Sequence, residues 1–314
     1  MPWTTPPKPF RSPSTGYHRA LPELKIFVIS LRRATERRRH MERLLSSLGL
    51  NAEFVDAVDG SSLTPEQQAT YDRDRALRVY GAEMTPAEIG CHLSHLSIYE
   101  RIVREGLGVT LVLEDDIECD GELPVVLEAA LRDRTLPWLV LRLQSTKSTI
   151  VFGDRAKGRG LDVARYGDRV VGRLRIGVLG GCGYLIKPEG ARRMLRYASR
   201  PFMPIDQTMD RFWENGIVPF VLRPFPIRQC EAIPSEIGDR KVRASLSTSQ
   251  TVLRRVQRFE DAVRKRYFQL TRLGGWPVDL TPLAVKAKAG WNAWNQGSSA
   301  RPEPVEPSVI PAEA

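Results

Sequence analysis

The stretch MTPAEIGCHLSHLSIYERIVREGLGVTLVLEDD, residues 84–116, decides the fold. Its first part predicts a helix, because Thr85 is an N-cap, Pro86 occupies the first helical position and Glu88 completes a capping box. Gly106 ends this helix, and the run VTLVL that follows is apolar or β-branched, as in a strand buried on both faces. A capped helix that leads directly into a buried strand indicates an α/β protein.

The alternation of strands and helices continues on both sides of that stretch. Buried strands are predicted at 23–31, 52–60, 109–113, 136–143, 175–186 and 217–222. Helices are predicted between them at 32–49, 84–106, 121–132, 187–199 and 204–216. Residues 144–175 have weak periodicity and are expected to form a long loop or a hairpin insert. The pattern predicts one α/β sheet that is covered by helices on both faces.

The positive charge of the chain lies mainly in its two ends. The 314 residues carry a net charge of +10, but residues 23–240 contain 32 Lys and Arg against 31 Asp and Glu. Residues 1–22 carry 3 basic residues and no acid, and residues 241–314 carry 12 basic and 6 acidic residues. Because a nucleic-acid-binding protein needs a basic face on its folded domain, we expect no nucleic-acid partner.

Composition also predicts domain boundaries and a compartment. The Pro-rich residues 1–22 and the tail 291–314 are expected to be disordered, with a folded domain at 23–240 and a basic helical extension at 241–290. The four cysteines are scattered without a CxxC pair, and no signal-peptide core follows Met1. No apolar run approaches the ~20 residues that cross a bilayer. We therefore expect a cytoplasmic protein that is not integral to a membrane.

The extension contains a basic amphipathic helix at residues 251–273. Its apolar residues recur at spacings of three and four, and basic residues fill much of the rest. Such a helix can bind an anionic membrane surface through apolar burial and charge. The alternative is a helix that packs on the folded domain and exposes its arginines.

Three acids, Glu114, Asp115 and Asp116, follow the predicted strand VTLVL. Alternation along a strand would place Glu114 and Asp116 on one face and Asp115 on the other. The carboxyl end of a strand is where open α/β sheets bind ligands, and carboxylate oxygens suit Mg²⁺ or Mn²⁺. The three acids are therefore the predicted metal ligands. The alternative is a solvated acidic loop that continues through Glu118 and Asp120.

The helix at 84–106 offers a second, softer set of metal ligands. Cys91 and His95 are four residues apart, and His92 and His95 are three apart, so each pair shares a side of the helix. Structural zinc needs four ligands, and no Cys pair lies nearby, so zinc is disfavoured. His95 is expected to bond to substrate or backbone, and His92 to be solvent-facing or a satisfied core residue.

Sequence motifs exclude several other classes of enzyme. There is no GxSxG motif of a serine hydrolase and no GxxxxGK[ST] phosphate-binding loop. No GxGxxG follows the first strand, so a dinucleotide-binding fold is not supported either.

Six blocks of the sequence resemble glycosyltransferase family 25, the family of the lipooligosaccharide enzymes. In order they are IFVISLRRATERRRHMERL, FVDAVDG, MTPAEIGCHLSHLSIYERI, LVLEDDIE, GCGYLIKPEGARRML and PIDQTM, and they span about 26–209. The resemblance implies a GT-A-type fold with a Rossmann-like mixed sheet, a nucleotide-sugar donor and a divalent metal. It also implies an inverting transfer, often of galactose from UDP-galactose, to a surface glycan. The GGCG segment around Cys182 is richer in glycine than the family pattern.

The resemblance implies roles for single residues as well. The acids at 114–116 match the family's acidic motif, Asp59 and Gly60 match its VDG block, and Asp206 matches the acid of its P-x-D block. Asp206 is the predicted general base, and Mn²⁺ or Mg²⁺ on the acidic motif would neutralise the leaving diphosphate. The predicted donor-binding residues are Ser30, Arg32, Arg37, Asp59, Gly60 and His95, with Arg38 on the same basic segment as the two arginines.

The predicted function is that of a metal-dependent inverting hexosyltransferase. It would move a hexose, such as galactose, from a UDP-sugar to a lipid-linked or surface glycan in lipopolysaccharide or surface-polysaccharide synthesis, at the inner membrane. One alternative is a nucleotidyltransferase that uses the same acids, and another is a non-catalytic protein that binds a nucleotide sugar or glycan.

Overall fold

The computed structural model describes residues 24–146, 160–230 and 246–273. The segments 1–22 and 291–314, which are predicted to be disordered, lie outside the described residues. Both predicted ends of the helical extension, at 241 and 290, lie outside them as well.

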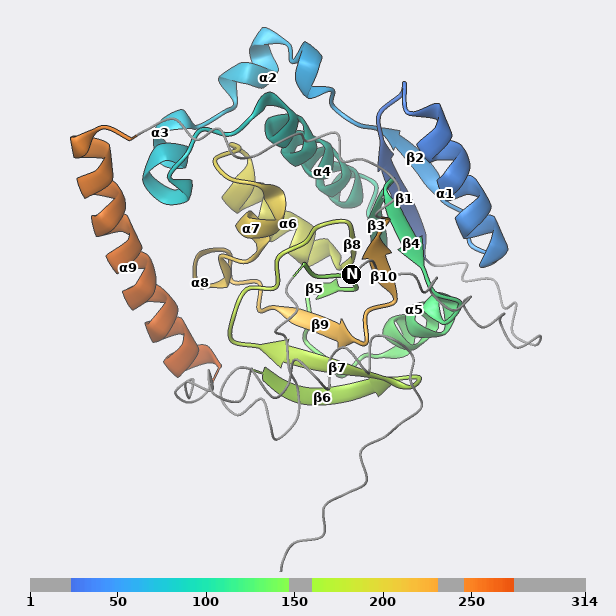
Figure 1. The fold of residues 1–314 in the computed structure, drawn as a ribbon. Coiled ribbons are helices and arrows are strands. Elements are labelled where there is room, and N and C mark those ends of the chain that lie inside the picture. The colour runs from blue at the N-terminus through green and yellow to red at the C-terminus, as the bar shows by residue number, and fades with distance from the viewer. Residues whose placement is uncertain (1–23, 147–159, 231–245, 274–314) are drawn as a thin grey trace, which may run out of the picture.

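An eight-stranded mixed sheet forms the centre of the molecule (Figure 1). In spatial order its strands are β2 (Glu53–Asp56), β1 (Lys25–Ser30), β3 (Thr110–Glu114), β8 (Gly183–Ile186), β5 (Val140–Arg142), β9 (Phe220–Arg223), β7 (Arg169–Leu174) and β6 (Gly160–Tyr166). Strand β1 is parallel to both β2 and β3, whereas β8 is antiparallel to β3 and β5. The chain therefore places β2 on one side of β1 and then crosses to place β3 on the other side.

Helices cover both faces of the sheet, as the sequence predicts. In β1, Ile26 and Val28 pack with helices α1 (Thr35–Ser47) and α5 (Leu123–Arg132) in one apolar core. The alternate residues Phe27 and Ile29 pack with α4 (Pro86–Arg104) and α6 (Pro188–Ala198) in a second core. Successive side chains of a strand point to opposite faces, so one apolar strand serves both layers.

Several elements differ from the predicted ones. The strand predicted at 175–186 is confined to β8, and the helix predicted at 204–216 is divided into α7 (Ile205–Met209) and α8 (Phe212–Asn215). The insert at 144–175 contains the β6–β7 hairpin. Residues 60–80 form the short helices η1 (Gly60–Ser62), α2 (Pro65–Ala69), α3 (Arg73–Arg75) and η2 (Ala76–Tyr80). A second, antiparallel sheet pairs β4 (Ile117–Cys119) with β10 (Ile227–Gln229).

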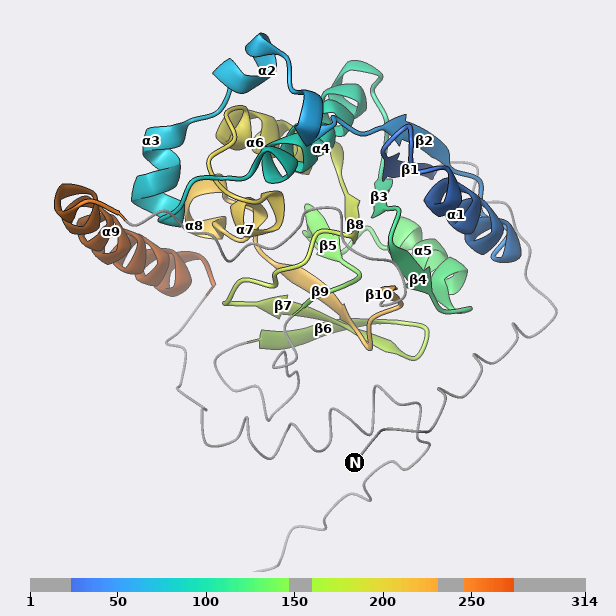
Figure 2. The same cartoon turned by 45° about the horizontal axis from the view of Figure 1, so that its top comes forward.

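The predicted basic helix is present as α9 (Thr248–Arg272), on the opposite side of the molecule from α1 (Figures 1 and 2). Polar contacts hold it against the body. Arg254 donates to the carbonyl oxygen of Tyr80 at 3.1 Å, and Arg211 donates to Asp261 at 2.5 Å. Near the other end of the helix, Gln269 donates to the carbonyl oxygen of Arg175 at 2.7 Å. Among the described residues, no helix is both long and apolar enough to cross a membrane.

Candidate functional site

A pocket of about 210 Å³ lies at the carboxyl ends of β1, β2 and β3. It opens where the chain crosses from one side of β1 to the other, which is where open α/β sheets bind ligands. Its lining comes from the end of β1, the turn after β2, the start of α4 and the acidic segment after β3. Predicted site residues in this lining are Ser30, Arg37, Asp59, Gly60, Glu114, Asp115 and Asp116.

The turn after β2 rests directly on the first turns of α4. A Cβ atom on Gly60 would lie 2.4 Å from the carbonyl oxygen of Pro86, and one on Gly90 would lie 2.5 Å from that of Val58. Glycine at both positions therefore permits a backbone-to-backbone approach that a side chain would prevent. Asp59 fixes the end of this turn, because its Oδ1 accepts from the Ser61 backbone N–H at 2.9 Å.

Asp115 is held by two partners from the α1 side of the sheet. The Ser30 hydroxyl donates to its Oδ2 at 2.6 Å, and Arg37 donates to its Oδ1 at 2.8 Å. The side chains of Asp115 and Arg37 are only 9% and 16% exposed. The protein itself therefore neutralises this carboxylate, and the pair joins α1 to the end of β3.

Asp116 has different surroundings from its neighbour. It is buried, and its Oδ2 accepts from Gln229 of β10 at 2.8 Å, but its Oδ1 has no hydrogen-bond partner among the described residues. Burial, together with the smaller effect of the negative charge on Glu114, raises the pKa of Asp116 to about 6. Strand β3 ends at Glu114, so the predicted alternation of faces does not extend to Asp116.

Glu114 points toward α4, the side of the sheet on which Val112 of β3 also packs. Its Oε1 lies 3.4 Å from the Nε2 of His95, and the Nδ1 of His95 lies 2.7 Å from the hydroxyl of Tyr184. His95 is completely buried, and it contacts Glu114 rather than lining the pocket. His92 is also buried, and its two ring nitrogens lie near backbone carbonyl oxygens, to one of which the neutral ring can donate. It is therefore a core residue and not the solvent-facing one, the other of its two predicted states.

The arginines that follow β1 have three different environments. Arg37 faces the pocket beside Asp115. Arg38 donates to the backbone carbonyl oxygen of Ser30 at 2.8 Å and to Asp56. The side chain of Arg32 is 90% exposed and does not line the pocket. Arg33, which is not among the residues predicted from sequence, lines the pocket and forms an ion pair with Asp59.

Asp206 lies in α7, across Gly181 from Glu114. A Cβ atom on Gly181 would be 3.6 Å from both the Cβ of Asp206 and the Oε1 of Glu114. The Gly180 N–H donates to Asp206 Oδ2 at 3.0 Å, and the Gln207 N–H donates to Oδ1 at 2.8 Å. The carboxylate therefore holds the glycine-rich loop, and its predicted role as a base stays a prediction.

Two further site residues have weak sequence signals. Gln229 reaches Asp116 only because β10 pairs with β4 across more than a hundred residues of chain. Tyr184 lies inside the predicted strand at 175–186, where an apolar pattern hides its hydroxyl. Alternation on β8 could have placed Tyr184 on the α4 side of the sheet, but the contact with His95 depends on the antiparallel order of β3 and β8.

Comparison with known proteins decides the family. Residues 23–209 match the family described as glycosyltransferase family 25 (LPS biosynthesis protein). The chain belongs to glycosyltransferase family 25. The matched region contains every residue predicted for the site, from Ser30 to Asp206, and it ends before α9.

Relatives in family 25 carry names of two kinds. A Homo sapiens protein named "Inactive glycosyltransferase 25 family member 3" is 32% identical over 228 residues, which cover 64% of this chain and 36% of that protein. "Procollagen galactosyltransferase 1" of Danio rerio is 25% identical over 221 residues, which cover 68% of this chain and 35% of that protein. This chain therefore spans about a third of the length of these curated relatives.

One solved structure resembles part of the chain. It is the crystal structure of a glycosyltransferase involved in the glycosylation of the major capsid of PBCV-1. The match has a TM-score of 0.27 and 10% sequence identity, and it covers 60% of this chain and 66% of the other.

The acidic segment fits the divalent cation that the resemblance to family 25 implies. The buried Oδ1 of Asp116 is without a hydrogen-bond partner among the described residues, and a cation would satisfy it. The negative charge of Glu114 contributes to the raised pKa of Asp116, and a cation beside Asp116 would offset this repulsion. Asp115 fits less well as a direct ligand, because Ser30 and Arg37 already bind both of its oxygens.

Proposed function

We propose that this family 25 protein is a metal-dependent, inverting glycosyltransferase of the GT-A type. It would move a hexose, with galactose as the first candidate, from a UDP-sugar to a glycan in lipopolysaccharide or surface-polysaccharide synthesis. The observation that carries the proposal is the half-satisfied, buried Asp116 at the pocket formed by β1, β2 and β3. The name of the Danio rerio relative supports galactose.

The pocket supplies groups that suit a nucleoside diphosphate. Arg33 and Arg37 line the pocket, and their guanidinium groups, although paired with Asp59 and Asp115, are suited to charge-assisted hydrogen bonds with phosphate oxygens. Asp59 can accept hydrogen bonds from hydroxyl groups of a ribose or sugar. A Mn²⁺ or Mg²⁺ ion on Glu114 and Asp116 would neutralise the charge that develops on the leaving diphosphate. The pocket is smaller than the roughly 300–1,000 Å³ of typical ligand sites, so a nucleotide sugar would extend beyond it.

Asp206 is the proposed general base. During transfer the bond between the anomeric carbon and the diphosphate oxygen breaks, and a bond from that carbon to the acceptor oxygen forms. The acceptor hydroxyl loses its proton, which a carboxylate such as Asp206 can take. Asp206 and Glu114 both lie beside Gly181, each 3.6 Å from the position that a Cβ atom would take there.

A transfer assay with matched variants tests this function. The released UDP is measured from UDP-galactose, with glycan acceptors and Mn²⁺. Asp116→Ala is expected to abolish transfer while the folded state is retained, and Glu122→Ala, an exposed acid on the same segment, is expected to keep it. Full activity of Asp116→Ala, or full activity in a chelator, would contradict the proposal.

The names of some relatives favour a second candidate function. Because one relative is named inactive, a non-catalytic protein that binds a nucleotide sugar or glycan is the alternative. Saturable binding of UDP-galactose with no UDP release, over a panel of acceptors, would establish it. The nucleotidyltransferase alternative predicts a different product, since it would release pyrophosphate instead of UDP.

Helix α9 supports a membrane-bound acceptor. The predicted alternatives were a helix on an anionic membrane and a helix packed on the domain with its arginines exposed. In the structure α9 packs on the body and exposes an apolar stripe, which consists of Val252, Val256, Phe259, Val263 and Tyr267. Phe259 is 71% exposed and Tyr267 is 69% exposed.

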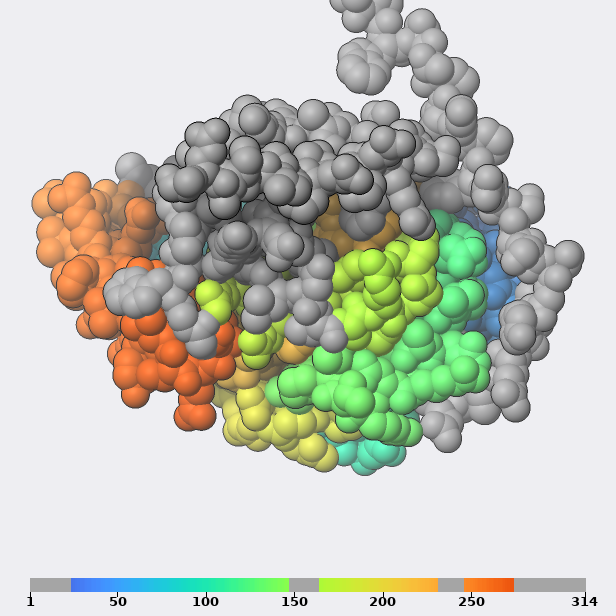
Figure 3. All heavy atoms as spheres, turned by 90° about the horizontal axis from the view of Figure 1, so that it is seen from below, coloured from blue at the N-terminus to red at the C-terminus, as the bar shows by residue number. Residues whose placement is uncertain are grey.

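The charge of this stripe's surroundings suits an anionic lipid surface. The exposed Arg255 lies three residues after Val252 and four before Phe259, so it shares their side of α9. Apolar burial and basic charge on one helix face bind anionic membranes together. Figure 3 shows α9 as a lobe beside the body, accessible from this side. We therefore propose a peripheral protein of the cytoplasmic face of the inner membrane, with a lipid-linked glycan as acceptor.

A further inference from the structure

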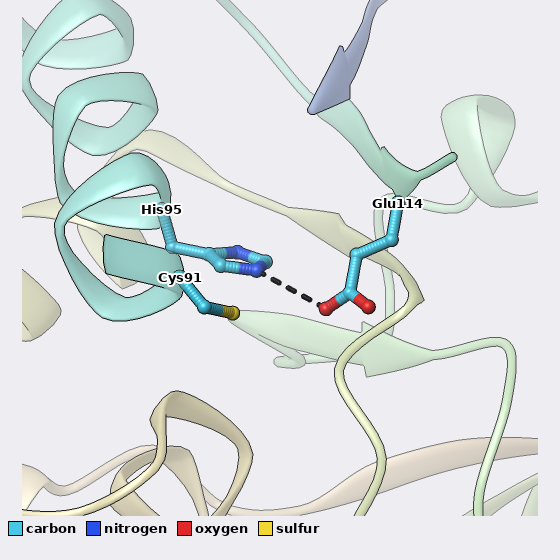
Figure 4. Close-up of side chains that lie close together, drawn as sticks. All are labelled: Cys91, His95 and Glu114. Atoms are coloured by element: carbon cyan, nitrogen blue, oxygen red, sulfur yellow. Dashed lines mark ion pairs between the residues drawn. The ribbon is translucent and has the colours of Figure 1, made fainter. Parts of the chain in front are cut away.

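Helix α4 and the end of β3 bring three possible metal ligands together. Cys91 and His95 lie one turn apart on α4, and Glu114 faces them (Figure 4). The sulfur, one imidazole nitrogen and one carboxylate oxygen all lie within 4.8 Å of one another. The sequence suggests the first two of these ligands, and the fold adds the third.

His95 presents one nitrogen to this cluster. Its Nδ1 bonds with the Tyr184 hydroxyl at 2.7 Å, and that hydroxyl lies 2.7 Å from the hydroxyl of Tyr99. The Nε2 atom is buried and has no hydrogen-bond partner among the described residues. A polar partner on the far nitrogen orients a metal-binding histidine and fixes its tautomer, so this arrangement suits Nε2 for metal binding.

The distance between His95 and Glu114 fits a shared ion. Their facing atoms are 3.4 Å apart, which is long for a charged hydrogen bond. Two ligands at bond lengths of ~2.0–2.1 Å on a tetrahedral zinc ion lie roughly 3.3–3.4 Å apart. The pair is therefore already at the separation that a tetrahedral ion requires.

We propose that Cys91, His95 and Glu114 form a three-ligand site for a borderline divalent cation such as Zn²⁺, with a fourth position open to water. The set of one sulfur, one nitrogen and one oxygen favours Zn²⁺ or Co²⁺ over the hard Mg²⁺ and Mn²⁺ ions. On binding, the Cys91 thiol gives its proton to solvent and the thiolate bonds to the metal. Neutral His95 keeps its proton on Nδ1, and this N–H donates a hydrogen bond to the hydroxyl oxygen of Tyr184.

This site is separate in chemistry from the one proposed for the sugar donor, although the two share Glu114. A cation held by Cys91 and His95 withdraws Glu114 from a cation on Asp116. The inference does not rest on sugar transfer, because it concerns metal binding by the chain without a donor.

Cobalt spectroscopy tests the site directly. The full chain, freed of metal and kept reduced, is titrated with Co²⁺ under anaerobic conditions. The expected result is one equivalent with a near-ultraviolet thiolate-to-cobalt band and intense visible bands of four-coordinate cobalt, both removed by one equivalent of Zn²⁺. A weak, six-coordinate spectrum without a thiolate band would overturn the proposal.

Matched variants identify the ligands. Cys91→Ser is expected to lose the thiolate band and His95→Gln to weaken binding more than about a hundredfold. Cys182→Ser is the control, because Cys182 also lies near Glu114 but outside the cluster, and it is expected to keep the band. An unchanged band in Cys91→Ser, or a band lost only in Cys182→Ser, would overturn the assignment.

The role of Tyr184 provides a readout that does not depend on removing a ligand. Tyr184→Phe keeps all three ligands and is expected to weaken Zn²⁺ affinity about tenfold to a hundredfold, with the cobalt bands unchanged in position. Circular dichroism shows whether each variant is folded. Unchanged affinity in a folded Tyr184→Phe would contradict the proposed orientation of His95.

Discussion

The adjacent acids Asp115 and Asp116 differ in how fully the protein satisfies their carboxylate oxygens. Asp115 is bound by Ser30 and Arg37, whereas Asp116 keeps one buried oxygen without a partner among the described residues. An acid that the protein satisfies contributes to stability, and an acid that the protein leaves unsatisfied is available to a ligand. We therefore expect substitutions at the two positions to separate stability from function.

The first prediction concerns these two acids. Asp115→Asn removes the charge that faces buried Arg37 and is expected to lower the free energy of unfolding by about 3 kcal/mol. Asp116→Asn removes a half-satisfied carboxylate that Glu114 repels, and is expected to raise the free energy of unfolding by about 1–2 kcal/mol while abolishing cation-dependent donor binding. Urea denaturation of both variants measures the difference, and a more stable Asp115→Asn would contradict the assignment of roles.

The second prediction concerns His92 and pH. Burial lowers the pKa of His92 to about 4, against the effect of the carbonyl oxygens of Ala198 and Met203, while the unfolded chain binds its proton near pH 6.5. The unfolded state therefore holds more protons between these values, so stability falls as the pH is lowered from 6.5 to 4. The expected contribution is on the order of 3 kcal/mol. Urea denaturation in a chelator, compared with His92→Gln, should show a steeper loss for the wild type; parallel curves would exclude it.

At the scale of elements, the contact between the β2 turn and α4 explains a glycine in the middle of a helix. Gly90 lies in the second turn of α4, where alanine would ordinarily stabilise the helix by about 1 kcal/mol. Here its Cβ would meet the carbonyl oxygen of Val58 at 2.5 Å. The close approach outweighs the helix propensity, because a backbone atom would have to move.

The third prediction follows from this contact. Gly90→Ala is expected to lower the free energy of unfolding by about 1–3 kcal/mol and to weaken donor binding through Asp59 and Gly60. Gly108→Ala is the control, since a Cβ atom there would have no neighbour within 4 Å among the described residues, and its stability is expected to be unchanged. Equal stability of the two variants in urea would show that the β2 turn adapts freely.

The fourth prediction concerns the exposed stripe of α9. The full chain is expected to co-sediment with vesicles that contain anionic lipids. Binding is expected to be weaker at high salt, and weaker to vesicles of neutral lipids. Phe259→Ser with Tyr267→Ser should reduce binding about tenfold or more, because both side chains are mostly exposed and their loss leaves the body contacts intact. Binding that is unaffected by this double substitution would contradict the role of the stripe.

Local sequence patterns predicted the helices and strands that carry their own caps or apolar runs. They missed the elements that are held by contacts between residues far apart in the sequence. The capping box of α4 and the apolar runs of β1 and β3 were sufficient to place these elements. The short helices at 60–80 have little periodicity of their own, and part of their support is remote, since Asp72 N–H donates to the Pro201 carbonyl oxygen at 2.8 Å. The pairing of β4 with β10 is remote in the same way.

The site itself was predicted in part for the same reason. Strand ends can be located from sequence, so the position of the pocket at Ser30, Asp59 and Glu114 could be predicted. The loop after β1 has no period that tells Arg32 from Arg33, and only the fold shows that Arg33 faces the pocket. The sequence also could not tell which side of α9 would face the body, because residues on either side of this helix are able to form contacts with the body.

At the scale of the whole molecule, the sheet has two parts with different connections. The parallel strands β2, β1 and β3 end at the pocket, and the rest of the sheet, from β8 to β6, carries antiparallel pairs. Asp206 and Gly181 come from segments of this second part. A ligand that spans the pocket and Gly181 would therefore contact both parts and stabilise the whole fold.

The fifth prediction measures this stabilisation. UDP-galactose with Mn²⁺ at about a hundred times its dissociation constant is expected to add about 2.7 kcal/mol to the folded state, or a rise in Tm of about 5–10 °C. A chelator should remove the rise, and Asp116→Asn should not show it. A rise of equal size without any divalent cation would exclude a metal-bridged donor.

The position of Glu114 between His95 and Asp116 has a practical consequence. If Glu114 binds either of two cations of different chemistry, the transferase activity of a preparation depends on which metal ions it has been exposed to. A preparation exposed to zinc or to an immobilised-metal resin would be inactive. The same preparation, freed of metal and then loaded with Mn²⁺, would be active. The bound metal ions of this chain should therefore be identified and quantified before an absence of activity in an assay is taken as a lack of catalytic function.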